Sequence, residues 1–411
     1  MPRLGPLLGL LCVLALAPAA SAADLPHTQA ALARQLALAG PGSGAYVVDL
    51  TTGAELYAAR PDAGRLPASV EKLYLTAAAL LRYGPEGHLT TSALAVGPPD
   101  PTTGVLAGDL VLRGGGDPTF GPAAADAFAA ALAGAGLTEV TGRVVGDESL
   151  FDGLRGPPSS GYRTSSDVGP LSALAFGEGR TGRRWPYFQA SPARFAAQAF
   201  EKALERQGVT IAGHARAGVA PNGTVTVSQF DSPSIADIVR RMNVPSDNFI
   251  AETLIKALGA QFGAGGSTAA GAAVVRGSVA GLGVRPRIVD GSGLSRADLT
   301  TPRQVVQLLS AMSLGNLAQP FEDSLAVAGR TGTLRKRMRR TLARDRCRGK
   351  TGTLRDVSNL AGYCDTTGGE QVAFAILMNR VNPYGARRLQ DRMTATLAAY
   401  DPGAFAAQAA R

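Results

Sequence analysis

The stretch PASVEKLYLTAAALL, residues 67–81, decides the fold, because it places a serine and a lysine at the start of an apolar helix. Its apolar residues recur at helical spacing until Gly84-Pro85, which predicts a helix that begins near Ser69. Ser69 and Lys72 are three residues apart, so both project from one face of the first turn. This spacing favours a hydroxyl and an amine that react together, although a helix cap would also explain Ser69.

The composition is that of a globular chain with few histidines. The 411 residues are 45% hydrophobic and 18% charged, which excludes a disordered or fibrous chain. Only three histidines occur, and no serine lies in a Gly-x-Ser-x-Gly motif. A serine nucleophile here therefore needs another base, and a desolvated lysine can take the hydroxyl proton. Only five of the 41 basic residues are lysines, so each lysine is a candidate for such chemistry.

The first residues predict export. Residues 1–22 combine a charged start, an apolar run over 4–17 and the small residues Ala20-Ser21-Ala22, which is typical of a signal peptide. No later stretch reaches 18 uninterrupted apolar residues. We therefore expect a protein secreted across the inner membrane, either periplasmic or extracellular and associated with the cell wall. The net charge of +9 favours anionic partners, but export argues against nucleic acid.

The remaining pattern predicts a catalytic domain with an insertion. A hairpin is expected over 44–58, strands over 348–354, 359–364 and 371–378, and a final helix near 386–400. These elements indicate an α/β sandwich formed by residues 23–90 and 231–411. Residues 91–230 instead show short strands (108–112, 140–145, 224–227), Gly/Pro-rich turns, and helices near 122–134 and 192–207. We expect them to form an inserted accessory domain.

Two further motifs follow the insertion. Ser246-Asp247-Asn248 begins another helix, and its hydroxyl and amide can relay a proton and orient a substrate, or it can simply cap the helix. Lys350-Thr351-Gly352-Thr353 lies on a predicted strand and offers a cation and hydroxyls to a carboxylate, with a glycine that lets a peptide approach. Arg330-Thr331-Gly332 competes for this third role, but the strand context favours Lys350 and a structural turn at 330.

The three motifs, in this order, resemble those of the S13 peptidase family, the D-alanyl-D-alanine carboxypeptidases/endopeptidases of the penicillin-binding protein 4 type. The resemblance also includes residues 115–119, 146–147, 151–153, 290–296 and 360–363. It implies a penicillin-binding protein/serine β-lactamase-like fold, in which helices flank an antiparallel sheet that carries a large α+β insertion. It further implies cleavage of peptidoglycan stem peptides, acylation by penicillins and other β-lactams, and no metal or organic cofactor.

The resemblance assigns roles to individual residues. Ser69 would be the acylated nucleophile and Lys72 its base, while Ser246 and Asn248 would complete the proton relay. Lys350, Thr351, Gly352 and Thr353 would bind the substrate's terminal carboxylate, and the N–H groups of Ser69 and Thr353 would form the oxyanion hole. A serine β-lactamase on the same core, or a catalytically silent wall-binding scaffold, remains the alternative.

Two cysteines and a basic segment complete the pattern. A hairpin that turns at Arg355-Asp356 places Cys347 opposite Cys364, which favours a disulfide over free thiols or a metal site.

Ten basic residues lie between positions 330 and 350, against a single acidic one. They indicate either an ordinary solvated loop or contact with an anionic wall polymer or a membrane surface.

Overall fold

One antiparallel six-stranded sheet, in the order β11-β12-β13-β14-β1-β2, joins the two ends of the chain. It belongs to a computed structural model that describes residues 23–182 and 187–404. The strands are β1 (Ser43–Asp49), β2 (Glu55–Ala59), β11 (Ala326–Val327), β12 (Cys347–Leu354), β13 (Val357–Asp365) and β14 (Gln371–Asn379).

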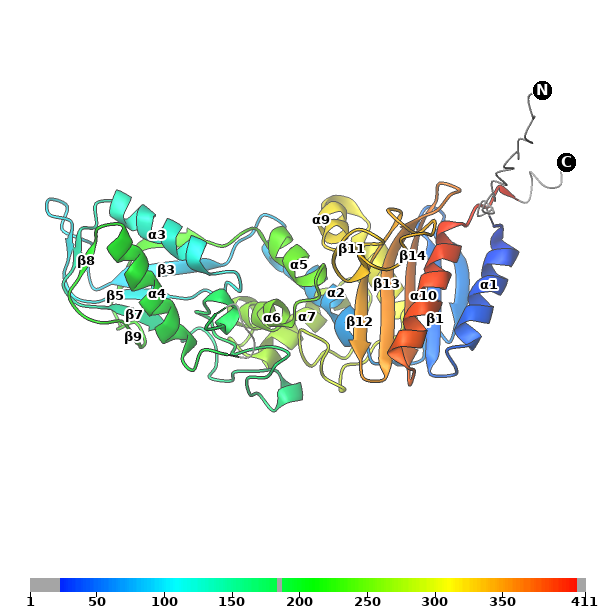
Figure 1. The fold of residues 1–411 in the computed structure, drawn as a ribbon, viewed down its shortest axis with the longest axis horizontal. Helices are drawn as coiled ribbons and strands as arrows, with labels where there is room; N and C mark the ends of the chain where they lie inside the picture. The colour runs from blue at the N-terminus through cyan, green and yellow to red at the C-terminus, as the bar shows by residue number, and fades with distance from the viewer. Residues whose placement is uncertain (1–22, 183–186, 405–411) are drawn as a thin grey trace, which may run out of the picture.

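Both faces of this sheet are covered by helices (Figure 1). The covering helices are α1 (Leu25–Ala37), α8 (Pro302–Met312) and α10 (Pro383–Ala398). Along β14, Phe374 and Ile376 pack in one apolar cluster with Leu32 of α1 and Leu397 of α10, whereas Ala375 packs in the cluster on the opposite face. A strand that is buried on both faces must be apolar throughout, which explains its uninterrupted hydrophobic run.

A layer of helices lies between the sheet and the rest of the molecule (Figure 1). These helices are α2 (Lys72–Tyr83), α5 (Ile235–Asn243), α6 (Asn248–Phe262), α7 (Thr268–Ala280) and α9 (Ala318–Asp323). The short 3-10 turn η1 (Ala68–Glu71) leads into α2 and contacts β12 and β13. The junction between helices and sheet therefore contains Ser69 and Lys72.

The residues between α2 and α5 form two smaller sheets with a core of their own. The five-stranded sheet consists of β3 (Thr90–Ala95), β5 (Leu110–Arg113), β7 (Val144–Asp147), β9 (Arg216–Ala217) and β10 (Val225–Asp231). The parallel three-stranded sheet consists of β4 (Val105–Leu106), β6 (Glu139–Val140) and β8 (Thr210–Ile211). Helices α3 (Pro122–Gly134) and α4 (Pro192–Arg206) supply the crossovers that parallel strands require. The division into catalytic and inserted domains stays a prediction.

Several elements differ from the sequence expectations. The segment at Ser69 is a 3-10 turn, and the α-helix begins only at Lys72. The expected strand over 140–145 is divided between β6 and β7, which belong to different sheets. The pattern gave no expectation for α1, α7 and α8, whereas α3 has the predicted bounds. The expected signal peptide lies outside the described residues.

The hairpin register places the two cysteines opposite each other, as predicted. Cys347 pairs with Cys364 in the β12–β13 ladder, and their sulfur atoms are bonded. The cross-link joins the ends of the two strands farthest from the turn. Within residues 23–182 and 187–404, no helix combines the length and apolar character that a membrane span requires.

Replacing both Cys347 and Cys364 with alanine should lower the free energy of unfolding. The disulfide closes a sequence separation of 17 residues, and a cross-link of this size restricts the unfolded chain by about 3 kcal/mol. Guanidinium unfolding of the purified variant would measure the loss, with reduced wild type as a comparison. If the double variant and the reduced protein unfold at the midpoint of the oxidised wild type, the cross-link contributes no stability.

Candidate active site

The 3-10 turn that leads into α2 places the side chains of Ser69 and Lys72 on the same side of the chain, one above the other. Residues three apart are eclipsed in a 3-10 helix, and Lys72 Nζ lies 3.0 Å from Ser69 Oγ. Ser69 does not cap the helix: its hydroxyl instead donates to the carbonyl oxygen of Ser292, at 3.2 Å. The helix-cap alternative for Ser69 is therefore wrong.

Lys72 is fully buried and has an acceptor for each of its three protons. Besides Ser69, its Nζ contacts Asn248 Oδ1 at 2.8 Å and the Ser292 carbonyl oxygen at 2.7 Å. Burial lowers the pKa of Lys72 to about 8, although nearby carboxyl groups, Asp290 first, oppose that shift. A lysine with this pKa is partly neutral at physiological pH and can accept a proton.

A second buried lysine, Lys350, lies near Lys72 and has hydrogen-bond partners of its own. Lys350 Nζ donates to Ser246 Oγ at 2.7 Å and to the carbonyl oxygen of Thr351 at 2.8 Å. Burial, followed by repulsion from Lys72, lowers the pKa of Lys350 well below its usual value. Asp247, the middle residue of the Ser246-Asp247-Asn248 motif, caps helix α6 through the N–H of Ile250. The motif therefore supplies a helix cap, while its Ser246 hydroxyl contacts Lys350 and its Asn248 amide oxygen contacts Lys72.

The Lys350 strand runs directly beside the 3-10 turn. A Cβ atom added at Gly352 would lie 2.6 Å from the Pro67 carbonyl oxygen and 3.1 Å from Ser69 N, so only glycine permits this approach. Thr351 Oγ1 donates to Thr333 Oγ1 at 2.9 Å. Thr333 directly follows Arg330-Thr331-Gly332, which competed for the third motif. Residues Gly332–Leu334 form the 3-10 turn η5 and not a strand.

The structure adds residues that motif analysis missed. Asn359 of β13 donates to the carbonyl oxygens of Leu66 and Pro67 and so fixes the chain just before Ser69. Ser292 lies in the 290–296 run that the sequence had singled out without assigning its contact. Glu252 accepts hydrogen bonds from the backbone of that run, and its position one helical turn after Asn248 was the available signal.

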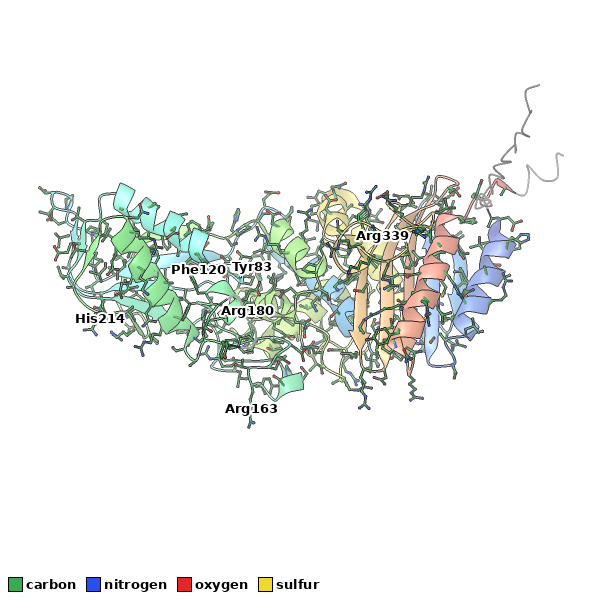
Figure 2. All side chains as sticks on the ribbon, viewed as in Figure 1. Tyr83, Phe120, Arg163, Arg180, His214 and Arg339 are labelled. Carbon is green, nitrogen blue, oxygen red and sulfur yellow. A yellow bond between two sulfur atoms is a disulfide. The ribbon has the colours of Figure 1, made fainter. Side chains whose placement is uncertain are left out.

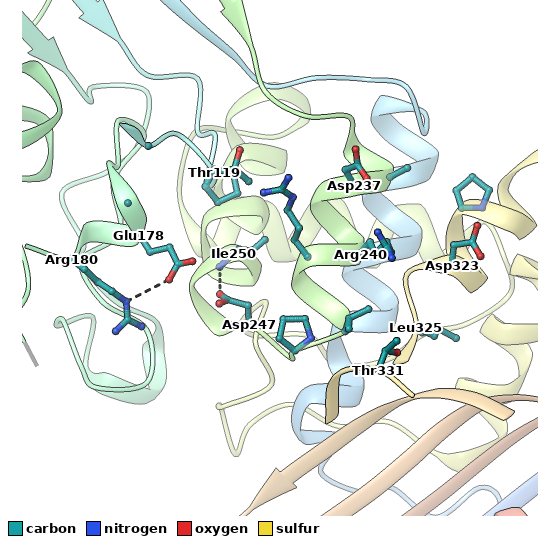
Figure 3. Close-up of a pocket in the computed structure, with 18 of the residues that line it drawn as sticks. Thr119, Glu178, Arg180, Asp237, Arg240, Asp247, Ile250, Asp323, Leu325 and Thr331 are labelled. Atoms are coloured by element: carbon teal, nitrogen blue, oxygen red, sulfur yellow. Dashed lines mark hydrogen bonds and ion pairs between the residues drawn. The ribbon is translucent and has the colours of Figure 1, made fainter. Parts of the chain in front are cut away.

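A groove of about 1410 Å³ begins beside Asp247 and Thr331 and extends along α5 toward the inserted region (Figure 3). Groups of both signs line it, among them Glu178, Asp237 and Arg240. The groove therefore lies next to the Ser246 motif through Asp247, but Ser69, Lys72, Ser246 and Lys350 do not line it.

The covered sheet, the helix-borne serine and lysine, and the adjoining strand define a peptidase of the penicillin-recognising serine class. Comparison with known proteins agrees: the chain belongs to the D-Ala-D-Ala carboxypeptidase 3 (S13) family, whose model matches residues 27–184 and 185–400. It is thus a serine carboxypeptidase/endopeptidase, as its motifs had led us to expect.

Named relatives and solved structures show the same similarity. A D-alanyl-D-alanine carboxypeptidase from Actinomadura sp. is 31% identical over 96% of this chain and 88% of its own length. Carboxypeptidase DacB from Mycolicibacterium smegmatis is 30% identical over 91% and 85%. Penicillin binding protein 4 from Haemophilus influenzae has the same fold, with a TM-score of 0.75, 20% identity and coverage of 90% and 99%. A penicillin G-acylated predatory endopeptidase from Bdellovibrio bacteriovorus gives a TM-score of 0.54 at 18% identity, with coverage of 86% and 88%.

Gly352→Ala should slow acylation because the new methyl group must push β12 away from the Ser69 turn. Misplacement of this kind costs roughly tenfold to a hundredfold in rate. The second-order rate constant with a fluorescent penicillin would report the loss. Gly277→Ala on α7 is the matched control, since a Cβ there meets nothing within 4 Å. Equal rates for the two variants would show that the close approach at Gly352 does not matter.

Proposed function

We propose that this enzyme cleaves the D-Ala-D-Ala end, or the cross-link, of peptidoglycan stem peptides through an acyl-enzyme on Ser69. The observation that carries the proposal is the set of hydrogen bonds made by Lys72, whose amine contacts the Ser69 hydroxyl and two further acceptors. The names of the S13 relatives support the substrate class.

The two further acceptors give Lys72 the geometry of a base. Once neutral, its amine keeps two protons, which Asn248 Oδ1 and the Ser292 carbonyl oxygen accept. The lone pair then points at Ser69 Oγ and can take the hydroxyl proton while the oxygen attacks the peptide carbonyl. Asn248 thus orients the base through its amide oxygen.

The second lysine serves the leaving group and the substrate. Ser246 Oγ accepts a hydrogen bond from Lys350, so its own proton is free to pass to the departing D-alanine amine. The proton that Lys72 took from Ser69 then restores the Ser246 hydroxyl. Thr351, Gly352 and Thr353 bind the terminal carboxylate along the β12 edge. The N–H groups of Ser69 and Thr353 stabilise the oxyanion. Water then hydrolyses the acyl-enzyme and regenerates the Ser69 hydroxyl.

We propose that β-lactams acylate the same serine. The Bdellovibrio endopeptidase of similar fold, which has a penicillin G-acylated structure, supports this reaction. A serine β-lactamase undergoes the same acylation but then hydrolyses the adduct rapidly. We also propose that the enzyme works outside the cytoplasmic membrane. The expected signal peptide and the Cys347–Cys364 disulfide support this location.

Ser69→Ala should abolish both the penicillin adduct and release of D-alanine, because no other hydroxyl of the described residues contacts Lys72. Removing such a nucleophile costs about 10⁶-fold in turnover. Intact mass spectrometry over several hours would follow the adduct on both proteins. A lasting adduct on wild type alone supports the peptidase. Rapid turnover without an adduct indicates a β-lactamase, and no reaction at all favours the silent scaffold.

We further propose that the basic segment over 330–350 contacts an anionic wall polymer. Arg335, Lys336, Arg339 and Arg340 are exposed and form no ion pair within the described part of the chain. Arg339 lies beside the six-stranded sheet, at the opposite end of the molecule from His214 (Figure 2). A membrane surface is less suitable because the apolar residues of the segment, such as Met338, pack into the core and are not available to insert.

Changing these four residues to glutamine should weaken retention on immobilised poly-glutamate, and lower the salt needed for elution, without changing penicillin acylation. The matched control replaces four other exposed basic residues: Arg34, Arg163, Arg194 and Lys202. If both variants elute at the same salt concentration, retention reflects net charge alone and the segment has no special role.

A further inference from the structure

Helix α6 carries three polar residues on one face of an otherwise apolar, buried surface. Asn248, Glu252 and Lys256 are spaced four residues apart, so they lie one above another. Asn248 contacts Lys72, and Lys256 donates to Asp152 in the inserted region, at 2.6 Å. Glu252 lies between them and is fully buried. The catalytic roles above account for Asn248 but not for Glu252.

Glu252 binds the backbone that serves the reacting pair. Its Oε1 accepts hydrogen bonds from the N–H groups of Gly291, at 3.1 Å, and Ser292, at 2.8 Å. The carbonyl oxygen of the same Ser292 accepts from Lys72 Nζ at 2.7 Å and from Ser69 Oγ at 3.2 Å. A single residue of backbone therefore separates the Glu252 contact from the two reacting side chains.

The turn that carries Ser292 is fixed by a further carboxylate. Asp290 accepts from the N–H groups of Gly293, at 2.7 Å, and Ser295, at 2.8 Å. Gly293 has a φ of +78°, and a Cβ there would lie 2.0 Å from the Ala68 carbonyl oxygen. The turn is thus pressed against the residue that precedes Ser69. Glu252 attaches this turn to α6 through its hydrogen bonds with Gly291 and Ser292.

We propose that Glu252 is a positioning residue for acylation, which holds the Ser292 carbonyl oxygen against the Lys72 amine and the Ser69 hydroxyl. This inference rests on the proposed function, because it concerns the pair that would form the acyl-enzyme. Because Glu252 holds the Ser292 carbonyl oxygen in place, one proton of the neutral Lys72 amine stays hydrogen-bonded to that oxygen. The lone pair of Lys72 then stays directed at Ser69.

The surroundings of Glu252 favour its neutral form. Its Oε2 is buried and has no hydrogen-bond partner in the described residues, which an ionised carboxylate tolerates poorly. Burial, and then the charge of Asp290, raise the pKa of Glu252 to about 8. The neutral acid uses Oε1 as the acceptor for the turn and places its proton on Oε2. Glutamine has the same shape and the same acceptor.

Ionisation of Glu252 would make Lys72 a poorer proton acceptor for Ser69. A negative charge at Glu252 favours the ammonium form of Lys72 and so raises the pKa of that lysine. In Glu252→Gln this charge cannot appear, so Lys72 should lose its proton at lower pH. The other ionisable groups that face this pair are unchanged by the substitution: Glu71 of η1, Asp247 and Lys256 of α6, Asp290 and Asp298 of the turn, and Lys350 of β12.

The test compares the acylation rate constants of wild type, Glu252→Gln and Glu252→Ala with a fluorescent penicillin, from about pH 6 to about pH 9.5. Glu252→Ala removes the acceptor, frees the turn, and should react roughly tenfold to a hundredfold more slowly. Glu252→Gln should react within about threefold of wild type at neutral pH, with the rising limb of its profile displaced to lower pH. Thermal unfolding of each protein shows whether a loss of rate is merely a loss of folding.

Glu201→Gln supplies a matched control. Glu201 of α4 also accepts from a backbone N–H, that of Ala215, at 2.6 Å, but does so in the inserted region. Its profile should coincide with that of wild type. The proposal is overturned if a folded Glu252→Ala reacts as fast as wild type, or if Glu252→Gln is slowed as much as Glu252→Ala without a displaced profile. Failure of wild type itself to be acylated would instead refute the proposed nucleophile, and with it the role of Glu252.

Discussion

The burial of the Lys72 amine is the constraint on which the rest of the structure depends. An amine removed from water needs an acceptor for every proton, or its burial becomes too costly. Its acceptors come from three separate places: the 3-10 turn, helix α6 and the turn after α7. None of these can move without leaving a buried proton unpaired. The 3-10 turn, helix α6 and the turn after α7 are therefore held in one arrangement around a single nitrogen atom.

Local signals in the sequence predicted the last three strands and the final helix of the catalytic part, but not α1, α7 or α8. The hydrophobic run of residues 371–378 predicted strand β14. The position of the turn at Arg355-Asp356 predicted the register of β12 and β13, because the turn determines which residues of the two strands lie opposite each other. The same logic failed at residues 140–145, where two short strands enter different sheets. Their separation depends on strand partners that are far away in sequence, because β6 pairs with β4 and β8 whereas β7 pairs with β5 and β9, and no local pattern encodes these partners.

The residues of the candidate site that act through their side chains could be predicted from the sequence. Those that act through a backbone group could not. Motifs predicted Ser69, Lys72, Ser246, Asn248 and Lys350. The structure places Lys72 in contact with Ser69 and Asn248, and Lys350 in contact with Ser246. The Ser292 carbonyl has no counterpart in such a pattern, since every residue possesses a carbonyl group. Its place depends on how the turn is attached to α6.

The sheet order has a consequence for the solution behaviour of the protein. Strand β11 has only two residues and pairs with Arg348 and Gly349, so within the described residues the β12 edge from Lys350 onward has no neighbouring strand. An open edge of this kind can pair with another chain and start aggregation. Under the proposed function a substrate peptide lies along this edge, so the backbone groups that bind substrate are the same ones that could pair with another chain. Substrate binding and colloidal stability thus make opposite demands on one strand.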